Sequence, residues 1–272
     1  MANFYTANDL EILIATKNRT NLDFLLPMFP FSHFSNFNIL IVNQSSDCLL
    51  TSSFPSVKVI NSNEIGLSKS RNLALNNASK KICLIADDDV VYYSNFENRI
   101  ITAFNQNPEA SIITFNHQRD GLDKPQNSSQ KIFSHTLKTI WNVSSIEIAF
   151  QLKDIKENKS HFDENFGLGS YFETAEEYLF LMDAIKLRLN ALFCPFVIVS
   201  HPIISSGENQ GSDKILFARA ALFYKTWGNL VYIWLLKYVF FLVRKGYISS
   251  NECMRKFKMG LTGIRKYKEL EK

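Results

Sequence analysis

Three consecutive carboxylates, Asp87, Asp88 and Asp89, follow an apolar run at residues 82–86 and are the side chains best suited to chemistry in this sequence. In an extended backbone, residues two positions apart project to the same side, so we expect Asp87 and Asp89 to face a ligand together. Such a pair can bind Mg²⁺ or Mn²⁺, and that cation would neutralise a diphosphate. An isolated Asp-Asp-Asp is more often an acidic turn or a helix N-cap. The surrounding segments are therefore needed to distinguish a metal site from these structural roles.

The elements that would position these acids are short apolar runs that read as buried strands, at residues 12–15, 39–42, 57–60, 82–86, 111–115 and 192–199. Helical spacing predicts helices over residues 66–77, 94–105 and about 175–190, and residues 145–152 read as a further strand. Strands that alternate with helices favour a mainly parallel sheet, and ligands bind such sheets at the carboxyl ends of the strands. The three aspartates fall at one of those ends.

Four segments form a recognisable set: EILIATKNR at residues 11–19, IVNQSSD at residues 41–47, GLSKSRN at residues 66–72, and Asp87-Asp88-Asp89. In this order they resemble the opening strand and T-x-N-R turn, the end of the second strand, the G-L-x-x-x-R-N helix and the DxD motif of family 2 glycosyltransferases. The resemblance covers residues 10–205 in the correct order and is specific as a set. It implies a GT-A-type α/β fold, a mainly parallel sheet flanked by helices, and a nucleoside-diphosphate sugar as donor.

By this resemblance the nucleotide-sugar site is formed by Thr16, Arg19, Gln44, Arg71, Asp87 and Asp88. The metal, Mn²⁺ or Mg²⁺, lies on Asp87 and Asp89. The guanidinium of Arg71 suits phosphate oxygens, and its alternative is a solvated helix arginine. The family often has Asp-Asp where this chain has Asn43-Gln44, although an amide can also hydrogen-bond a nucleotide base.

Inverting transfer needs a base that takes the proton of the acceptor hydroxyl. FDENFGLG at residues 162–169 and TAEEYLF at residues 174–180 resemble the segments that hold the family's acidic pair, which more usually ends in Asp. By position Glu177 is the base, and Glu176 is the second candidate. The alternative is structural, because Thr174 and Glu177 also have the spacing of a capping box at a helix start.

His201, after the last apolar strand, resembles a histidine that family members place near the metal or the diphosphate. The alternative is a solvated histidine in a turn. Residues 205–211 have the Gly and polar composition of a loop that closes over a donor, or of an ordinary linker.

Other classes find little support. The four cysteines have no metal-binding or redox spacing and read as reduced packing residues. There is no Walker A sequence and no nucleophile elbow, which argues against P-loop and hydrolase functions. A sugar-1-phosphate nucleotidyltransferase would carry a Gly-rich signature near its start, and residues 15–19 contain no glycine. The first residues do not resemble a secretory signal, so we expect a cytoplasmic protein.

The C-terminal region combines an apolar stretch with positive charge. Residues 227–243 are mostly apolar and contain one charged residue, Lys237. Residues 244–272 hold nine Lys or Arg against three Glu. The net charge of residues 244–272 is therefore +6. Because the whole chain has a net charge of +4, residues 1–243 carry a net charge of −2. We expect a helix in the interface of the inner membrane, and the alternatives are packing against the catalytic domain or a dimer contact. No nucleic-acid-binding pattern accompanies the charge.

Taken together, the sequence predicts a GT-A-like catalytic domain over residues 1–212 and a basic helical extension over residues 213–272. The expected reaction moves a sugar, with inversion, from a nucleoside-diphosphate sugar to a glycan or lipid-linked glycan, in the assembly of bacterial surface polysaccharide. The alternative from another class is an inactive GT-A-like scaffold or nucleotide-sugar-binding protein at the membrane.

Overall fold

The computed structural model describes residues 4–47, 49–119, 125, 127–201 and 210–271, and these fall into two compact units. The sheet unit comprises the described residues up to Asp163 and from Glu177 to His201. The helical unit comprises residues 164–176 and 210–271. The sequence predicted a single domain boundary, after residue 212. The structure differs in the short segment 164–176, which packs with the C-terminal helices.

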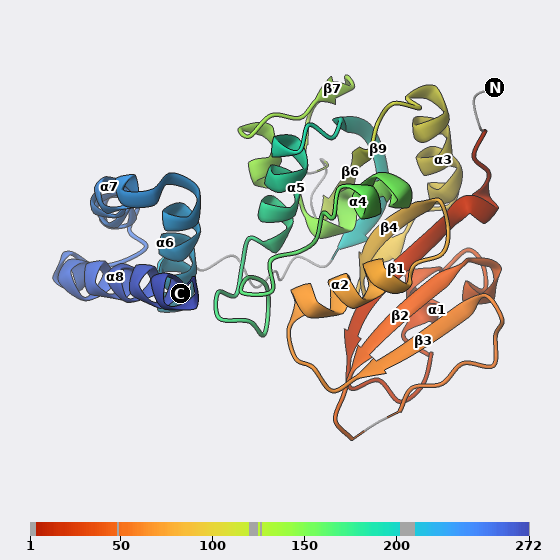
Figure 1. Cartoon of the computed structure of the whole chain (residues 1–272), viewed down its shortest axis with the longest axis horizontal. Coiled ribbons are helices and arrows are strands. Elements are labelled where there is room, and N and C mark those ends of the chain that lie inside the picture. The colour runs from red at the N-terminus through yellow and green to blue at the C-terminus, as the bar shows by residue number, and fades with distance from the viewer. Residues whose placement is uncertain (1–3, 48, 120–124, 126, 202–209, 272) are drawn as a thin grey trace. The chain divides into compact units, whose positions relative to one another are not determined.

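The sheet unit is built on one mixed sheet with the strand order β3-β2-β1-β4-β8-β6-β9-β5, to which β7 is added beside β9 (Figure 1). Strands β3, β2, β1 and β4 run parallel, whereas β8 is antiparallel to both of its neighbours. The strands are β1 (Leu10–Lys17), β2 (Ile39–Gln44), β3 (Val57–Ser62), β4 (Ile82–Asp87), β5 (Val91–Tyr92), β6 (Ile112–Arg119), β7 (Phe133–Ser134), β8 (Ile148–Gln151) and β9 (Ala191–His201).

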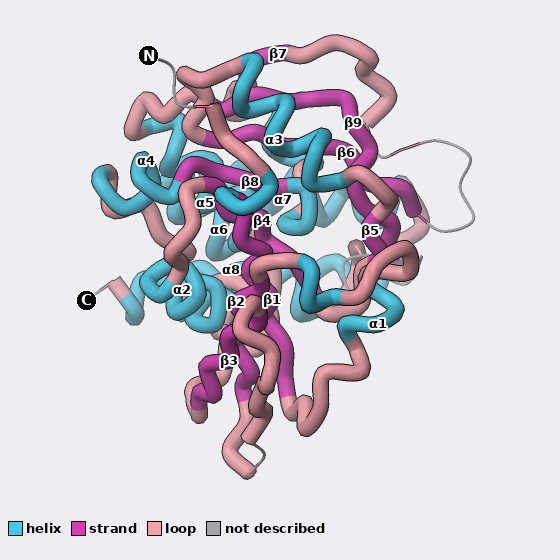
Figure 2. Tube along the Cα trace, turned by 90° about the vertical axis from the view of Figure 1, so that its right-hand side faces the viewer, coloured by secondary structure: helices cyan, strands magenta, loops and turns pink. Residues whose placement is uncertain are grey.

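Helices cover both faces of this sheet (Figure 2). They are α1 (Leu25–Met28), α2 (Leu67–Asn77), α3 (Phe96–Gln106), α4 (Leu152–Glu157) and α5 (Glu176–Lys186). Alternate residues of the parallel strands, such as Ile12 and Ile14 of β1, join one core cluster with the apolar faces of α1 and α3. The predicted strand at residues 145–152 is shorter in the structure, because Ser145–Glu147 forms a 3-10 turn that a Ser144 to Glu147 capping box closes.

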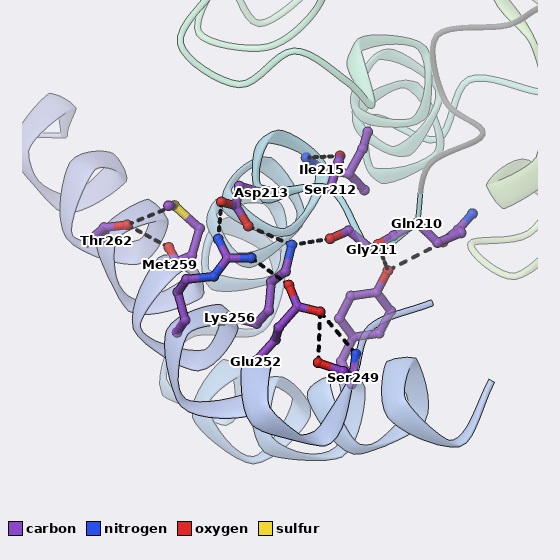
Figure 3. Close-up of polar contacts among 12 residues, drawn as sticks. Gln210, Gly211, Ser212, Asp213, Ile215, Ser249, Glu252, Lys256, Met259 and Thr262 are labelled. Carbon is purple, nitrogen blue, oxygen red and sulfur yellow. Dashed lines mark hydrogen bonds and ion pairs between the residues drawn. The ribbon is translucent and has the colours of Figure 1, made fainter. Parts of the chain in front are cut away.

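The helical unit contains α6 (Asp213–Trp227), α7 (Val231–Arg244) and α8 (Cys253–Leu270). Ser212 caps α6 by accepting a hydrogen bond from the amide of Ile215 at 3.2 Å. Lys256 of α8 is buried, and its ammonium contacts the Gly211 carbonyl and the Asp213 carboxylate, the latter at 2.6 Å (Figure 3). The hydrogen bond from Lys256 and the one from Arg255 hold the pKa of Asp213 below its usual value. These ion pairs tie the start of α6 to α8.

Residues 164–174 form a tight loop within the helical unit. The amide of Gly167 donates to the Phe172 carbonyl at 2.8 Å, and the amide of Phe172 donates to the Asn165 carbonyl at 2.9 Å. The rings of Phe166 and Phe172 are fully buried, and both contact Tyr267 of α8 at centroid distances of 6.0 Å. Phe166 and Phe172 therefore attach this loop to the last helix.

Candidate donor and metal site

The carboxyl ends of β1, β2 and β4 bring the predicted nucleotide-site residues to one edge of the sheet. In the register, Ala15 lies opposite Asp87 of β4, and Thr16 lies opposite Asn43 of β2. The residues that follow each strand therefore meet at this edge, as expected for parallel strands.

Asp88 is the carboxylate that closes the turn after β1. It accepts a hydrogen bond from the Thr16 hydroxyl at 2.5 Å, and Nε and Nη2 of Arg19 donate to the same oxygen at 3.0 and 2.7 Å. The guanidinium of Arg19 also lies over the Phe24 ring, 4.9 Å from its centroid. The interaction joins two turns that are 72 residues apart in the chain. Thr16, Arg19 and Asp88 thus form one network, with the Arg19 side chain 40% exposed toward solvent.

Asp87 is oriented from two sides. Nη2 of Arg71, on α2, contacts Oδ1 of Asp87 at 2.9 Å, and the Ser145 hydroxyl lies 3.5 Å from Oδ2. The Arg71 side chain is only 4% exposed, so the alternative of a solvated helix arginine is wrong. A buried guanidinium needs a charged partner, and Asp87 supplies it. Asp87 itself remains 31% exposed and keeps a surface for a ligand.

Asp89 and His201 meet across the sheet edge. Nε2 of His201, at the end of β9, lies 3.6 Å from Oδ1 of Asp89, and the Asp89 side chain is 55% exposed. Burial raises the pKa of Asp89; the nearby His201 opposes this rise, and the charges of Asp87 and Asp88 add to it. A carboxylate crowded by two others gains most from a bound cation, because the cation stabilises its ionised form.

The donor atoms at this edge fit a divalent cation that a ligand also coordinates. A carboxylate oxygen and an imidazole nitrogen 3.6 Å apart can share one ion, and an imidazole suits Mn²⁺ better than Mg²⁺. Within the described ranges, no group of three or more His, Cys, Asp or Glu side chains is arranged to hold a metal by itself. Phosphate oxygens of a donor would complete the coordination.

Asn43 and Gln44 stabilise turns. The fully buried Asn43 amide donates to the Arg19 carbonyl at 3.1 Å and to Oδ1 of Asn61 at 3.0 Å, and its oxygen accepts from the Arg19 amide at 3.0 Å. Gln44 donates to the Gly66 carbonyl at 2.8 Å, at the start of α2. The two amides where the family often has acids therefore fix the backbone around the site.

Glu176 and Glu177 are the first two residues of α5. Ala175, directly before them, has a φ of 69°, outside the helical region, so the regular helix begins at Glu176. Glu176 is 7% exposed, whereas Glu177 is half-buried. The division between the two compact units falls at this pair, with Glu176 in the helical unit and Glu177 in the sheet unit.

The sequence did not indicate a buried pair behind Asp87. Nδ1 of His117 on β6 lies 2.8 Å from Oε1 of Glu147, with both side chains 4% exposed. The other oxygen of Glu147 accepts from the Ser144 amide at 2.9 Å, which fixes the turn that presents Ser145 to Asp87. The Ser144-x-x-Glu147 spacing was a signal for this turn, but its histidine partner is 30 residues away and could not be read from spacing.

His135 has a structural role. Burial lowers the pKa of His135 to about 4, and its ring contacts the hydroxyls of Thr114 and Thr139, which marks a neutral structural histidine. Of the predicted loop at residues 205–211, all but its last two residues lie outside the described residues.

Comparison with known proteins gives a family and a fold. The profile described as Glycosyl transferase family 2 matches residues 12–171. No curated protein sequence matches the chain. S. aureus TarS 1–349 in complex with UDP-GlcNAc has a similar fold at 14% identity, with a TM-score of 0.55 over 96% of this chain and 91% of that one. The mannosyltransferase PcManGT from Pyrobaculum calidifontis, in complex with GDP-Man and Mn²⁺, gives 13% identity and a TM-score of 0.52 over 80% of this chain and 64% of that one. The predicted family and GT-A-type α/β fold are confirmed.

Proposed function

The chain belongs to glycosyl transferase family 2, and from that membership we propose that it is an inverting, metal-dependent enzyme that transfers a sugar from a nucleoside-diphosphate sugar to an acceptor hydroxyl. The observation that carries this proposal is the cluster at one sheet edge. There Asp87 is paired with the buried Arg71, and Asp89 lies 3.6 Å from His201. This is a negatively charged edge with an imidazole, suited to a cation and a diphosphate.

Support for the donor class comes from similar folds and from the local chemistry. Two solved structures of similar fold are complexes with UDP-GlcNAc and with GDP-Man and Mn²⁺. In this chain the Thr16, Arg19 and Asp88 network borders the same edge as the metal residues. A nucleoside on the turn after β1 would leave its diphosphate near Asp89.

The reaction needs a stabilised leaving group and a base. A divalent cation held by Asp89 and His201, with Asp87 beside it, would neutralise the departing nucleoside diphosphate. Glu177 takes the proton of the acceptor hydroxyl as its oxygen attacks the anomeric carbon in line, which inverts that centre. The more accessible position of Glu177 suits this role, and the buried Glu176 would orient the start of α5.

We further propose that the acceptor is a glycan or a lipid-linked glycan of a bacterial surface polysaccharide. The protein would then work in the cytoplasm, peripherally on the inner face of the membrane. The sheet unit would carry the donor site, and the helical unit would serve as the membrane-facing extension.

The test is a thermal-shift panel of UDP-, GDP-, CMP- and dTDP-linked sugars with and without Mn²⁺, on the native chain and on Asp89→Ala. A ligand that binds only the folded protein raises its melting temperature by mass action. We expect one donor to stabilise the native chain in a metal-dependent manner and to lose this effect in Asp89→Ala. Glu157→Ala, which removes an exposed carboxylate on α4, is the control and should keep the shift.

A second variant separates chemistry from binding. Glu177→Gln should keep the metal-dependent donor shift and lose transfer to the acceptor, because an amide cannot take the hydroxyl proton. If a donor stabilises the native chain but is neither transferred nor slowly hydrolysed, the alternative of an inactive nucleotide-sugar-binding protein is favoured. No shift with any donor would contradict the proposed donor site.

A further inference from the structure

Helix α7 presents an apolar surface to solvent. Its outward residues Ile233, Leu236, Phe240 and Phe241 are 57%, 61%, 69% and 40% exposed, and Leu230 just before the helix is 64% exposed. We call these five residues the outer face of α7. Surface helices normally present polar side chains outward, so an outward apolar row on one helix requires an explanation.

The opposite side of α7 is an ordinary core face. Val231, Leu235, Val239 and Leu242 are buried in one cluster with α6 and α8. The Tyr238 hydroxyl accepts a hydrogen bond from Arg219 of α6 at 2.5 Å, which fixes the rotation of α7 about its axis. The helix therefore carries apolar side chains on both its buried and its exposed sides, and the helical unit covers only one of them.

Length argues that α7 lies along a membrane rather than across it. The stretch Asp213–Arg244 is long and apolar enough to cross a membrane by length and composition. However, Gly228, with a φ of 57°, separates α6 of 15 residues from α7 of 14 residues. A spanning helix needs about 20 residues, and α7 would cover only about 21 Å of a 30 Å apolar layer.

Charge indicates which surface covers the outer face. Lys237 and Arg244 lie on the exposed side of α7, and Lys245 follows it, also exposed. Residues 214–251 contain no Asp or Glu. Trp234 and Tyr238 are half-buried and stack at 4.7 Å along the flank of the helix, a position that aromatic rings favour at a lipid interface. Apolar side chains with cations and without acids complement anionic phospholipid.

We propose that the outer face of α7 inserts into the headgroup region of an anionic bilayer, with the helix parallel to the membrane and Lys237, Arg244 and Lys245 against the lipid phosphates. This inference specifies which surface makes the proposed membrane contact. It rests on the proposed function only because that function explains why the protein would work at a membrane. The binding itself requires no donor, no metal and no transfer.

The test is co-sedimentation of the full chain with vesicles of phosphatidylcholine alone or with about 30% phosphatidylglycerol. We expect binding to the anionic vesicles that weakens as salt is raised, and a blue shift of tryptophan fluorescence on binding. Leu236→Ser with Phe240→Ser should lower the partition coefficient about tenfold or more. The control is Leu26→Ser with Leu187→Ser, two leucines of the sheet unit that are 51% and 45% exposed, and it should bind like the native chain.

Lys237→Glu with Arg244→Glu should abolish the preference for anionic vesicles, because the charge complementarity is reversed. All variants are checked for native melting temperatures, and metal-dependent donor stabilisation should persist in each of them. Loss of lipid binding with donor binding intact thus separates this inference from the proposed function. Failure of the native chain to bind anionic vesicles would overturn the inference. A second result would also overturn the inference. If the chain self-associates with rising concentration, and the two α7 serine substitutions remove this association but leave vesicle binding unchanged, the outer face of α7 contacts a second copy.

Discussion

Asn43 is a single buried amide that holds the backbone beside the proposed donor site. It both donates to and accepts from the backbone of Arg19, and it donates to Asn61. Asn43→Asp would introduce the acid that the family often has here but remove both donors, leaving a buried carboxylate against a carbonyl and an amide oxygen. We expect the free energy of unfolding to fall by about 2 to 4 kcal/mol at neutral pH, measured by urea denaturation.

The control for this substitution is Asn77→Asp, which removes an exposed side-chain hydrogen bond at the end of α2. It should change the free energy of unfolding by less than about 0.5 kcal/mol. Equal stability of the native chain and Asn43→Asp would contradict the role of Asn43 in holding the Arg19 backbone. It would favour a direct contact between residue 43 and the nucleotide instead.

Glu97 is a carboxyl whose burial should make folding pH-dependent. It lies in the first turn of α3, on a cavity of about 340 Å³, and burial raises its pKa from 4.5 to about 7. The folded protein therefore retains this proton between pH 4.5 and 7, where the unfolded chain releases it. Its contribution to stability is lost as pH rises through this window, and the loss is complete above pH 7.

Glu97→Gln removes that titration. The variant should gain stability relative to the native chain as pH rises from 5 to 8, by about 1 kcal/mol after allowance for partial solvent exposure. Urea denaturation at the two pH values measures it, with Glu109→Gln, an exposed glutamate beyond α3, as the control. An identical difference at both pH values would refute the raised pKa.

Local patterns in the sequence predicted most of the elements but few of the interactions between them. The strand expected at residues 82–86 is β4 (Ile82–Asp87), and the helix expected at residues 66–77 is α2 (Leu67–Asn77). These follow from apolar runs and spacing within the element. Asp88 was expected in the nucleotide-sugar site with Thr16 and Arg19, but the direct contacts among the three were not predicted. Thr16 and Arg19 are about 70 residues distant from Asp88, and no local pattern encodes such a pairing.

Two glycines of α8 differ in what a side chain would meet: Gly263 faces α6, and Gly260 faces α7. A methyl group at Gly263 would overlap the backbone carbonyl of Phe217, whereas one at Gly260 would overlap the flexible end of Leu235. Backbone cannot move without separating the helices, but Leu235 can change rotamer. Gly263→Ala should therefore lower the free energy of unfolding by about 2 to 3 kcal/mol.

Gly260→Ala serves as the matched variant. Alanine improves helix propensity by about 1 kcal/mol, which offsets part of the clash with Leu235, so this variant should stay within about 1 kcal/mol of the native chain. Thermal unfolding followed by circular dichroism compares the two. A smaller effect at position 263 than at position 260 would contradict the close approach of α6 and α8.

At the scale of the whole molecule, the chain enters the helical unit at residues 164–176 before it completes the sheet unit. Tyr267 of α8 is 3% exposed and contacts the rings of Phe166 and Phe172 in the loop that leads into α5. Tyr267→Ala should lower the stability of the helical unit by about 3 kcal/mol and reduce sugar transfer, because the segment before Glu177 loses its support.

Tyr267→Phe keeps the ring and removes only the hydroxyl, which accepts from Lys225 at 3.3 Å. It should retain nearly native stability and transfer. The comparison is made by denaturation and by initial rates with a fixed donor. Full transfer activity in a folded Tyr267→Ala protein would mean that the loop does not position the proposed base.

The attachment of residues 164–174 to α6 and α8 also has a consequence for biosynthesis. The parallel strands β1 to β4 all end by Asp87, so all four leave the ribosome early. Phe166 and Phe172 emerge long before Phe217 and Tyr267, their ring partners in the helical unit. The segment that leads into the proposed base therefore lacks these ring contacts until α8 has been translated. We expect a nascent chain that stalls before α8 to hold a formed sheet while the loop at residues 164–174 lacks its contacts with Tyr267.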